Sequence, residues 1–229
     1  MSPKERGILI GVLAACAASG AWLQSANPVH MELVCQEDGF VEYAQAFLYF
    51  FAGAIFAYVG SHKPFRNVWY WGYALLFLAI AGEEVSWGQR IFDLATPAAL
   101  DAINVQHETT IHNIGKVQHH LRLVALLVSL GISWAIPLTD RFVPALRRVY
   151  RLLDMPVFPL WVSPLSAIGA AFMIVPRLRG AILFNLDEMG ELYFALAFFG
   201  FGLSAYRKAS AALEREEARE GAVAQPLPA

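Results

Sequence analysis

Long apolar stretches alternate with short polar segments along the whole chain. A bilayer core about 30 Å thick is crossed by a helix of roughly 20 predominantly apolar residues. Stretches that reach or approach this length predict membrane spans over 7–24, 39–60, 68–88, 117–138, 156–175 and 187–206. The pattern therefore predicts an all-α integral membrane protein, a bundle of about six transmembrane helices.

Two of these spans have alternative interpretations. The first follows Lys4 and Arg6 and ends among small residues, so a cleaved signal peptide is an alternative, although no convincing A-x-A site precedes Trp22. The fifth contains Pro159 and Pro164. Because proline breaks or kinks a helix, this span is expected to be kinked or partly re-entrant.

The distribution of Lys and Arg predicts the orientation of the bundle, because cytoplasmic loops carry an excess of these residues. With the N-terminus inside, twelve of the 17 fall on the cytoplasmic side: Lys4, Arg6, Lys63, Arg66, Arg141, Arg147, Arg148, Arg151, Arg207, Lys208, Arg215 and Arg219. The remaining five are Arg90, Lys116, Arg122, Arg177 and Arg179. Both termini are therefore expected in the cytoplasm.

Composition agrees with a membrane protein and narrows its partners. The chain is 57% hydrophobic and 16% charged, whereas soluble domains are about 45–50% apolar and about 25% charged. A net charge of −2 without a basic stripe argues against nucleic acid. Cys16 and Cys35 do not form a disulfide framework and are expected to be free thiols.

Two segments outside the spans have their own character. Thr96 and Pro97 resemble an N-cap followed by proline at the first helical position, which predicts a short interfacial helix on the outer surface between spans three and four. Residues 1–208 would form the transmembrane domain. Residues 209–229 would form a charged cytoplasmic tail, partly helical and partly disordered.

Acids and histidines gather on the outer side once this topology is imposed. They are Glu37, Asp38, Glu42, Glu83, Glu84, His107, Glu108, His112, His119, His120, Asp187, Glu188 and Glu191. A structural explanation is open for several of them, because an acid in the first turn of a helix is stabilised by about 0.3–1 kcal/mol.

Glu83 and Glu84 resist that explanation, because they lie at the C-terminal end of their helix, where negative charge is unfavourable. A charge inside the bilayer costs roughly 2.5–3.5 kcal/mol and is a functional candidate. The alternatives are a buried ion pair with Arg90 or Arg122, or protonated carboxyls bonded between helices. Glu83, Trp87 and Arg90 would share one helical face, so the two carboxylates are expected to have different partners.

The histidines suggest a metal. If a helix runs unbroken from about 107 into the fourth span, Glu108, His112 and His119 lie on one stripe. A carboxylate and two histidines facing acids from other helices could bind zinc or another divalent metal. The candidate ligands are Glu84, Glu108, His112, His119 and Glu188. The alternative is that these histidines are structural, hydrogen-bonded groups.

Three motifs carry a resemblance: Glu37-Asp38-Gly39 with Glu42, the segment from Gly82 to Phe92 that reads G-E-E-V-S-W-G-Q-R-I-F, and Gln106 to Asn113. With them the chain resembles a family of uncharacterised bacterial multi-pass membrane proteins, which implies the bacterial inner membrane. It is more distantly similar to CAAX-type intramembrane proteases, whose first motif is E-E-x-x-x-R. Gly88 stands at the arginine position of that motif, and the later histidine motifs are not reproduced.

These features give two functional hypotheses. In the first, a periplasm-facing, metal-dependent site acts on a lipid or lipid-linked substrate: Glu83 and Arg90 are catalytic, and Arg122, Trp87 and Glu42 contact the substrate. In the second, the protein is a proton or cation transporter, or an accessory subunit of a membrane complex. Membrane lipids are the expected partners, together with a membrane-protein partner or a second copy of the chain.

Overall fold

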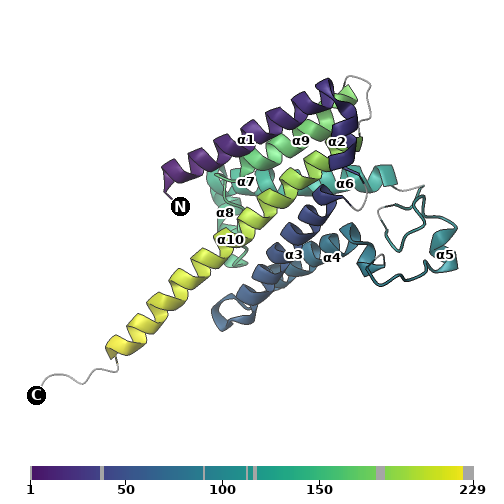
Figure 1. Ribbon diagram of the computed structural model, residues 1–229. Helices are drawn as coiled ribbons and strands as arrows, with labels where there is room; N and C mark the ends of the chain where they lie inside the picture. Colours follow the sequence, from purple (N-terminus) through teal and green to yellow (C-terminus); the bar gives the residue numbers. More distant parts are fainter. Residues whose placement is uncertain are drawn as a thin grey trace, which may run out of the picture.

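The computed structural model describes residues 2–36, 39–89, 91–111, 113–115, 118–178 and 184–223. These residues fold almost entirely into helices, with an isolated bridge between Asn104 and Ile114 and no strand in the described part. The helices are α1 (Pro3–Ala26), α2 (Pro28–Val34), α3 (Phe40–Ser61), η1 (Lys63–Phe65), α4 (Val68–Glu84), η2 (Ser86–Gly88), α5 (Ala98–Asp101), α6 (Gln118–Leu130), η3 (Gly131–Ala135), α7 (Ile136–Phe142), α8 (Pro144–Leu152), α9 (Ser163–Leu178) and α10 (Phe184–Val223). Figure 1 shows their arrangement.

Four helical segments within the described residues are long and apolar enough to cross a bilayer: Pro3–Ala26, Phe40–Ser61, His120–Phe142 and Asn185–Arg219. They correspond to the expected first, second, fourth and sixth spans. A helix also stands at each of the other two expected spans, but α4 has 17 residues and α9 has 16. The all-helical prediction is therefore confirmed, and the number of crossings stays a prediction.

The core is built around α3, which packs against α4 on one side and α10 on the other. Aromatic rings from all three helices meet there. The ring of Phe56 on α3 lies 5.7 Å from that of Phe77 on α4 and 4.9 Å from that of Phe201 on α10, centroid to centroid. Such pairs contribute about 0.5–1.5 kcal/mol beyond burial alone.

Glycines let α9 approach α10 closely. A Cβ on Gly169 would lie 2.7 Å from the carbonyl oxygen of Gly190, and a Cβ on Gly190 would lie 2.6 Å from Met173. Small residues at helix contacts are the usual means of close packing in membranes, because lipid tails give apolar side chains no incentive to associate.

Hydrogen bonds attach the α6–α7 rod to α9. The rod contains a π-helical turn, Gly131–Ala135. There the Trp134 indole nitrogen donates to the Ser166 hydroxyl at 3.1 Å, and the Ser163 hydroxyl donates to the Ser133 carbonyl at 2.6 Å. Interhelical bonds of this kind stabilise helix pairs in membranes.

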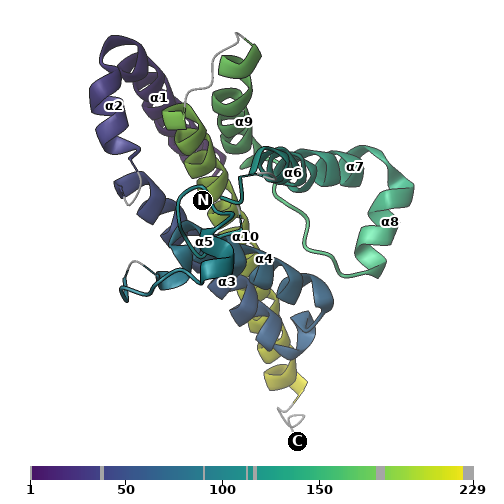
Figure 2. The ribbon, with the colours of Figure 1, turned by 90° about the vertical axis from the view of Figure 1, so that its right-hand side faces the viewer.

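The peripheral helices expose apolar surface. α1 and the α6–α7 rod flank the core and leave most of their apolar residues uncovered (Figures 1 and 2). Exposed apolar surface on this scale marks a membrane or protein interaction. This surface is consistent with helices that are long and apolar enough to cross a membrane.

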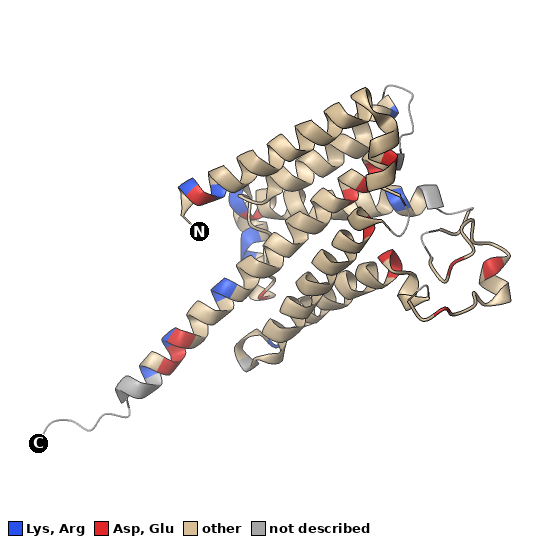
Figure 3. Cartoon of the chain, in the orientation of Figure 1, with Lys and Arg blue, Asp and Glu red and all other residues tan. Residues whose placement is uncertain are grey.

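Charges separate between the two ends of the bundle. Lys and Arg gather near the start of α1, on α8 and along the second half of α10, whereas Asp and Glu predominate at the opposite end of the bundle and also occur on the far part of α10 (Figure 3). The expected charged tail continues α10 as far as Val223, and residues 224–229 lie outside the described part.

Candidate functional site

α4 ends at Glu84, four residues before the expected end of the third span. Ser86, Trp87 and Gly88 have φ angles of 48°, 54° and 79°. Successive left-handed residues cannot continue a right-handed helix, and only glycine adopts such φ values without steric cost. The turn therefore ends the helix and directs the chain into the segment that precedes α6.

Trp87 folds back onto α4. A Cβ on Gly82 would meet the Trp87 ring at 2.8 Å, so the indole lies directly on the helix backbone. Its nitrogen donates to Oε1 of Glu83 at 2.7 Å. The expected shared helical face of Glu83 and Trp87 is wrong, because α4 ends at Glu84, although the turn still brings the two side chains into contact. Arg90, the expected third member, lies outside the described residues.

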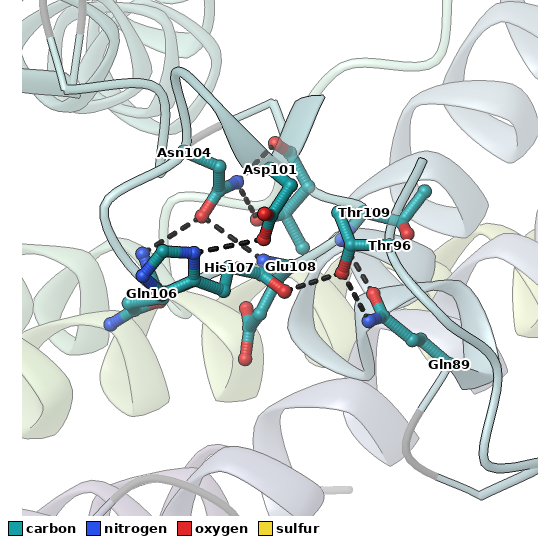
Figure 4. A network of polar contacts seen from close by, with 9 residues as sticks. Gln89, Thr96, Asp101, Asn104, Gln106, His107, Glu108 and Thr109 are labelled. Carbon is teal, nitrogen blue, oxygen red and sulfur yellow. Dashed lines mark hydrogen bonds and ion pairs between the residues drawn. The ribbon is translucent and has the colours of Figure 1, made fainter. Parts of the chain in front are cut away.

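The loop after this turn is tied to the end of α4. The other carboxylate oxygen of Glu83 accepts the backbone N–H of Ile111 at 2.7 Å. Gln89 accepts the N–H of Thr109 at 2.6 Å and donates to the Thr96 hydroxyl at 2.5 Å. Thr96 in turn donates to the carbonyl of His107 (Figure 4). Side chains of the G-E-E-V-S-W-G-Q segment thus hold the loop.

The loop also has an internal frame. The Asn104 amide donates to the Thr110 carbonyl at 2.9 Å and accepts the N–H of Gln106 at 2.9 Å (Figure 4). Asn113 donates to Oε2 of Glu108 at 3.3 Å and also to Gln106. Three residues of the motif from Gln106 to Asn113 therefore share one hydrogen-bond network.

The expected continuous helix from about 107 is wrong. The chain is non-helical from 104 to 111 and from 113 to 115, and α6 begins only at Gln118. The Asn104 side chain bonds nearby backbone groups, which favours turns over helix. Glu108 is therefore buried in the loop and does not share a stripe of α6 with the histidines. His112 and the side chain of His119 lie outside the described residues.

The short helix expected near Thr96 is present as α5, Ala98–Asp101. Pro97 occupies the N-cap position, and Thr96 bonds the loop instead of capping the helix. His107 lies beside α5, with its Nδ1 atom 2.8 Å from a carboxylate oxygen of Asp101. The position of α5 at a membrane surface stays a prediction.

Glu84 faces a different set of groups from Glu83. Its carboxylate lies close enough to those of Glu42, Glu188 and Glu191 to interact electrostatically. The four residues come from α3, α4 and α10, and all are half-buried. We call them the carboxylate cluster. The two adjacent glutamates therefore have different partners, as predicted.

Gln45 lies in the wall of the carboxylate cluster. It is fully buried, and its amide nitrogen donates to the Glu188 carbonyl at 2.8 Å and to Oε2 of Glu188 at 3.4 Å. Its Oε1 atom has no hydrogen-bond partner among the described residues. A buried polar atom without a partner costs about 1–3 kcal/mol, so this oxygen marks a position where a donor or a cation would be stabilised.

Arginines stand beside the cluster. Arg177 makes a bidentate pair with the buried Asp187, at 2.6 and 2.7 Å, and Arg122 lies 3.8 Å from the same carboxylate. Arg122 also attracts Glu188 and Glu191 electrostatically. Arg122, which was a predicted partner for Glu83 or Glu84, thus forms an ion pair with Asp187 on α10.

Cys35 follows α2 beside the same region. It is a free cysteine, as is Cys16, in agreement with the prediction. Burial raises the pKa of the Cys35 thiol to about 11, and the negative charge of Glu188 contributes to the increase. The thiol is therefore protonated and inert near neutral pH.

The structure brings together only part of the expected metal site. Glu84 and Glu188 are close, but Glu108 lies in the loop frame. Among the side chains that the structure describes, no group of three or more His, Cys, Asp or Glu is arranged to hold a metal ion. Gln45 was not expected at the site, and Glu191 was expected at this end of the bundle but not among the candidate ligands. Gln45 follows Glu42 by three residues, and Glu191 follows Glu188 by three, so each pair lies on one helical face. This spacing was the sequence signal that could have identified both residues.

Comparisons with family models, with curated proteins and with solved structures find no match to this chain. The resemblance carried by the three sequence motifs stays a prediction.

Proposed function

We propose that this protein is a multi-pass inner-membrane protein whose carboxylate cluster binds a cation, either a proton or a metal ion, from the periplasmic side. The observation that carries the proposal is the electrostatic interaction of the Glu84 carboxylate with those of Glu42, Glu188 and Glu191, which come from α3 and α10, beside a buried Gln45 oxygen that has no hydrogen-bond partner among the described residues. Intramembrane carboxylates of this kind are characteristic of ion and proton handling.

Electrostatics supports binding of a positive charge. Glu42, Glu84, Glu188 and Glu191 repel one another in an environment of low dielectric, and Arg122, which partly offsets this repulsion, is shared with Asp187. A proton on one carboxylate, or a cation between two of them, relieves the repulsion. Oxygen ligands of this type suit hard cations such as Mg²⁺, Ca²⁺ and Mn²⁺.

Thermal unfolding of the detergent-purified chain tests this proposal. Mg²⁺, Ca²⁺, Mn²⁺, Zn²⁺ and Na⁺ would be titrated at constant ionic strength, with choline chloride as the reference, and the pH would be varied separately. A bound cation stabilises the fold by RT ln(1 + [L]/Kd), about 2.7 kcal/mol at a hundredfold excess over Kd. We expect one cation, or acidification, to raise the melting temperature of the wild type.

The matched variants decide whether the cluster is responsible. Glu84→Gln/Glu188→Gln removes two of its charges, whereas Glu32→Gln removes an exposed acid of α2. The response should disappear only in the double variant. If no cation and no change of pH stabilises the wild type, or if both variants respond as it does, the proposal is wrong.

A second candidate function is metal-dependent hydrolysis of a lipid-linked substrate. It is favoured by the proximity of Glu84 and Glu188, two of the predicted metal ligands. The contacts of Glu83 argue against its role as a general base, because both of its carboxylate oxygens already accept hydrogen bonds. Near-stoichiometric zinc in the purified protein, lost in His112→Ala/His119→Ala, would favour this candidate over simple cation binding.

The proposed topology has six crossings with both termini inside. The 17 residues of α4 extend about 26 Å at about 1.5 Å per residue, and local bilayer thinning accommodates a short span at modest cost. Alkaline phosphatase fused after His62 should be inactive, because that loop would be cytoplasmic. A fusion after Ala95 should be active. The reverse pattern would contradict the orientation.

A further inference from the structure

Helix α8, at the basic end of the molecule, has features that the carboxylate cluster does not explain. We infer that α8 binds the headgroups of anionic phospholipids in the leaflet opposite the carboxylate cluster. This inference depends on the protein being embedded in a membrane, and it is independent of what the cluster binds.

The first observation is the division of α8 into two faces. At about 100° per residue, Arg147, Arg148 and Arg151 fall within an arc of about 100°. Leu146 and Val149 lie on the other side and are exposed. A short helix with cationic and apolar faces is typical of segments that lie in the plane of the membrane interface.

The second observation is a hollow of about 340 Å³ on the cationic face. It is lined by Pro144, Arg147, Arg148, Arg151 and Leu152. A hollow bordered by three arginines and a leucine suits a phosphate attached to an acyl chain. Guanidinium groups bind phosphate through paired hydrogen bonds, which makes Arg the preferred residue for this contact.

The arginines have different freedom to bind a ligand. Arg147 is held by the backbone, because its Nε donates to the Asp140 carbonyl at 2.5 Å and its terminal nitrogen donates to the Arg141 carbonyl. Arg148 and Arg151 are exposed, and within the described residues neither side chain makes a hydrogen bond or ion pair. Arg147 therefore forms a fixed wall, and the other two can close on an anion.

The third observation is the apolar surface around the hollow. Phe142, just before α8, is 69% exposed, and Leu152 at its end is 77% exposed. The helix turns away from the axis of α7 at the end of the molecule where Lys and Arg gather (Figures 1, 2 and 3). Exposed apolar residues beside arginines suit the boundary between acyl chains and headgroups. If the partner of α8 were an acidic soluble protein instead, Phe142 and Leu152 would stay exposed to water.

Native mass spectrometry of the full-length protein in a neutral detergent tests the inference. The protein would be titrated with phosphatidylglycerol or with phosphatidylcholine carrying the same acyl chains. We expect phosphatidylglycerol to bind more tightly, by roughly tenfold, because each basic residue near an anionic lipid surface adds to the attraction.

Variants locate the binding site. Arg148→Gln/Arg151→Gln should remove most of the preference for phosphatidylglycerol. Arg215→Gln/Arg219→Gln, which removes two exposed charges from the far part of α10, should leave it unchanged. The single variant Arg148→Gln should show an intermediate loss of the preference for phosphatidylglycerol. Size-exclusion chromatography would reveal a double variant that does not fold, and the single variant would then still test the inference.

Three outcomes would overturn the inference. The first is equal binding of the two lipids by the wild type, and the second is an equal loss of preference in the α10 variant. The third is displacement of phosphatidylglycerol by millimolar inorganic phosphate, because the hollow would then be a site for free phosphate and not for a lipid.

Discussion

Oε2 of Glu83 and the backbone N–H of Ile111 are joined by a hydrogen bond of 2.7 Å, although 28 positions separate the two residues. The bond attaches the middle of the loop between α4 and α6 to the last turn of α4. A carboxylate that is unfavourable at a helix C-terminus is thus stabilised by donors that the loop and Trp87 bring to it.

Replacement of Glu83 by Ala should loosen this loop. A hydrogen bond to a charged group contributes about 1.5–3 kcal/mol, so amide hydrogen exchange at Ile111 and its neighbours should accelerate by roughly 10- to 100-fold. Exchange measured by mass spectrometry on peptides covering 104–115 checks this. Glu84→Gln, which alters the carboxylate cluster instead, should leave exchange in the loop slow, and equal acceleration in both variants would contradict the anchoring role.

Loss of Arg177 should strongly destabilise the fold. Asp187 is buried and paired with Arg177 through two hydrogen bonds. Breaking a buried pair from one side costs about 3–5 kcal/mol, because it leaves an uncompensated charge. Arg177→Gln should lower the free energy of unfolding in detergent by that amount, and Arg177→Gln/Asp187→Asn should recover much of it. If Arg177→Gln were as stable as the wild type, Arg122 alone would be sufficient to compensate the buried charge of Asp187.

Substitution of Gly169 by Ala should separate α9 from α10. The added Cβ would lie 2.7 Å from a backbone carbonyl, which cannot move without the helix. Overpacking of this kind costs about 1–3 kcal/mol. Gly72→Ala on α4 is the matched control, because nothing lies within 4 Å of its added Cβ. Unfolding of both variants in detergent should show a loss only at Gly169.

Cys35 should react with alkylating reagents only at high pH. Its pKa in the fold is about 11, against an ordinary value of 9.0. Because the fold favours the protonated thiol, Cys35 contributes fully to the free energy of unfolding below pH 9. This contribution falls as the pH rises from about 9 to about 11. In a Cys16→Ser background, alkylation of the native protein should be slow at pH 8 and should accelerate on denaturation. Fast labelling of the native protein at pH 8 would contradict the burial of the thiol.

The helices were predictable because their apolar stretches are long and uninterrupted. The sequence also placed Glu42, Glu84, Glu188 and Glu191 at one end of the bundle, since helix lengths fix which end each residue reaches. α4 nevertheless ends before its apolar pattern does. The left-handed residues Ser86 and Trp87 carry no distinctive sequence signal, because non-glycine residues rarely adopt this conformation.

The loop before α6 was harder to predict, for a physical reason. Its conformation depends on side-chain contacts between distant positions, such as Gln89 with Thr109, whereas helical periodicity is local. The apolar periodicity of the fourth span therefore led us to predict a helix that begins at about 107, whereas α6 begins at Gln118. Gln45 was missed because its spacing from Glu42 indicates a site only together with Glu188, which lies on a helix far away in sequence.

The length of α10 has a mechanical consequence. Its 40 residues measure about 60 Å at about 1.5 Å per residue, roughly twice the thickness of the hydrocarbon core. The part that continues past the bundle (Figure 1) is therefore a stiff lever attached to the same helix that carries Glu188 and Glu191. A force applied to this part of α10 outside the bilayer would act on the same continuous helix that carries Glu188 and Glu191, beside Glu84.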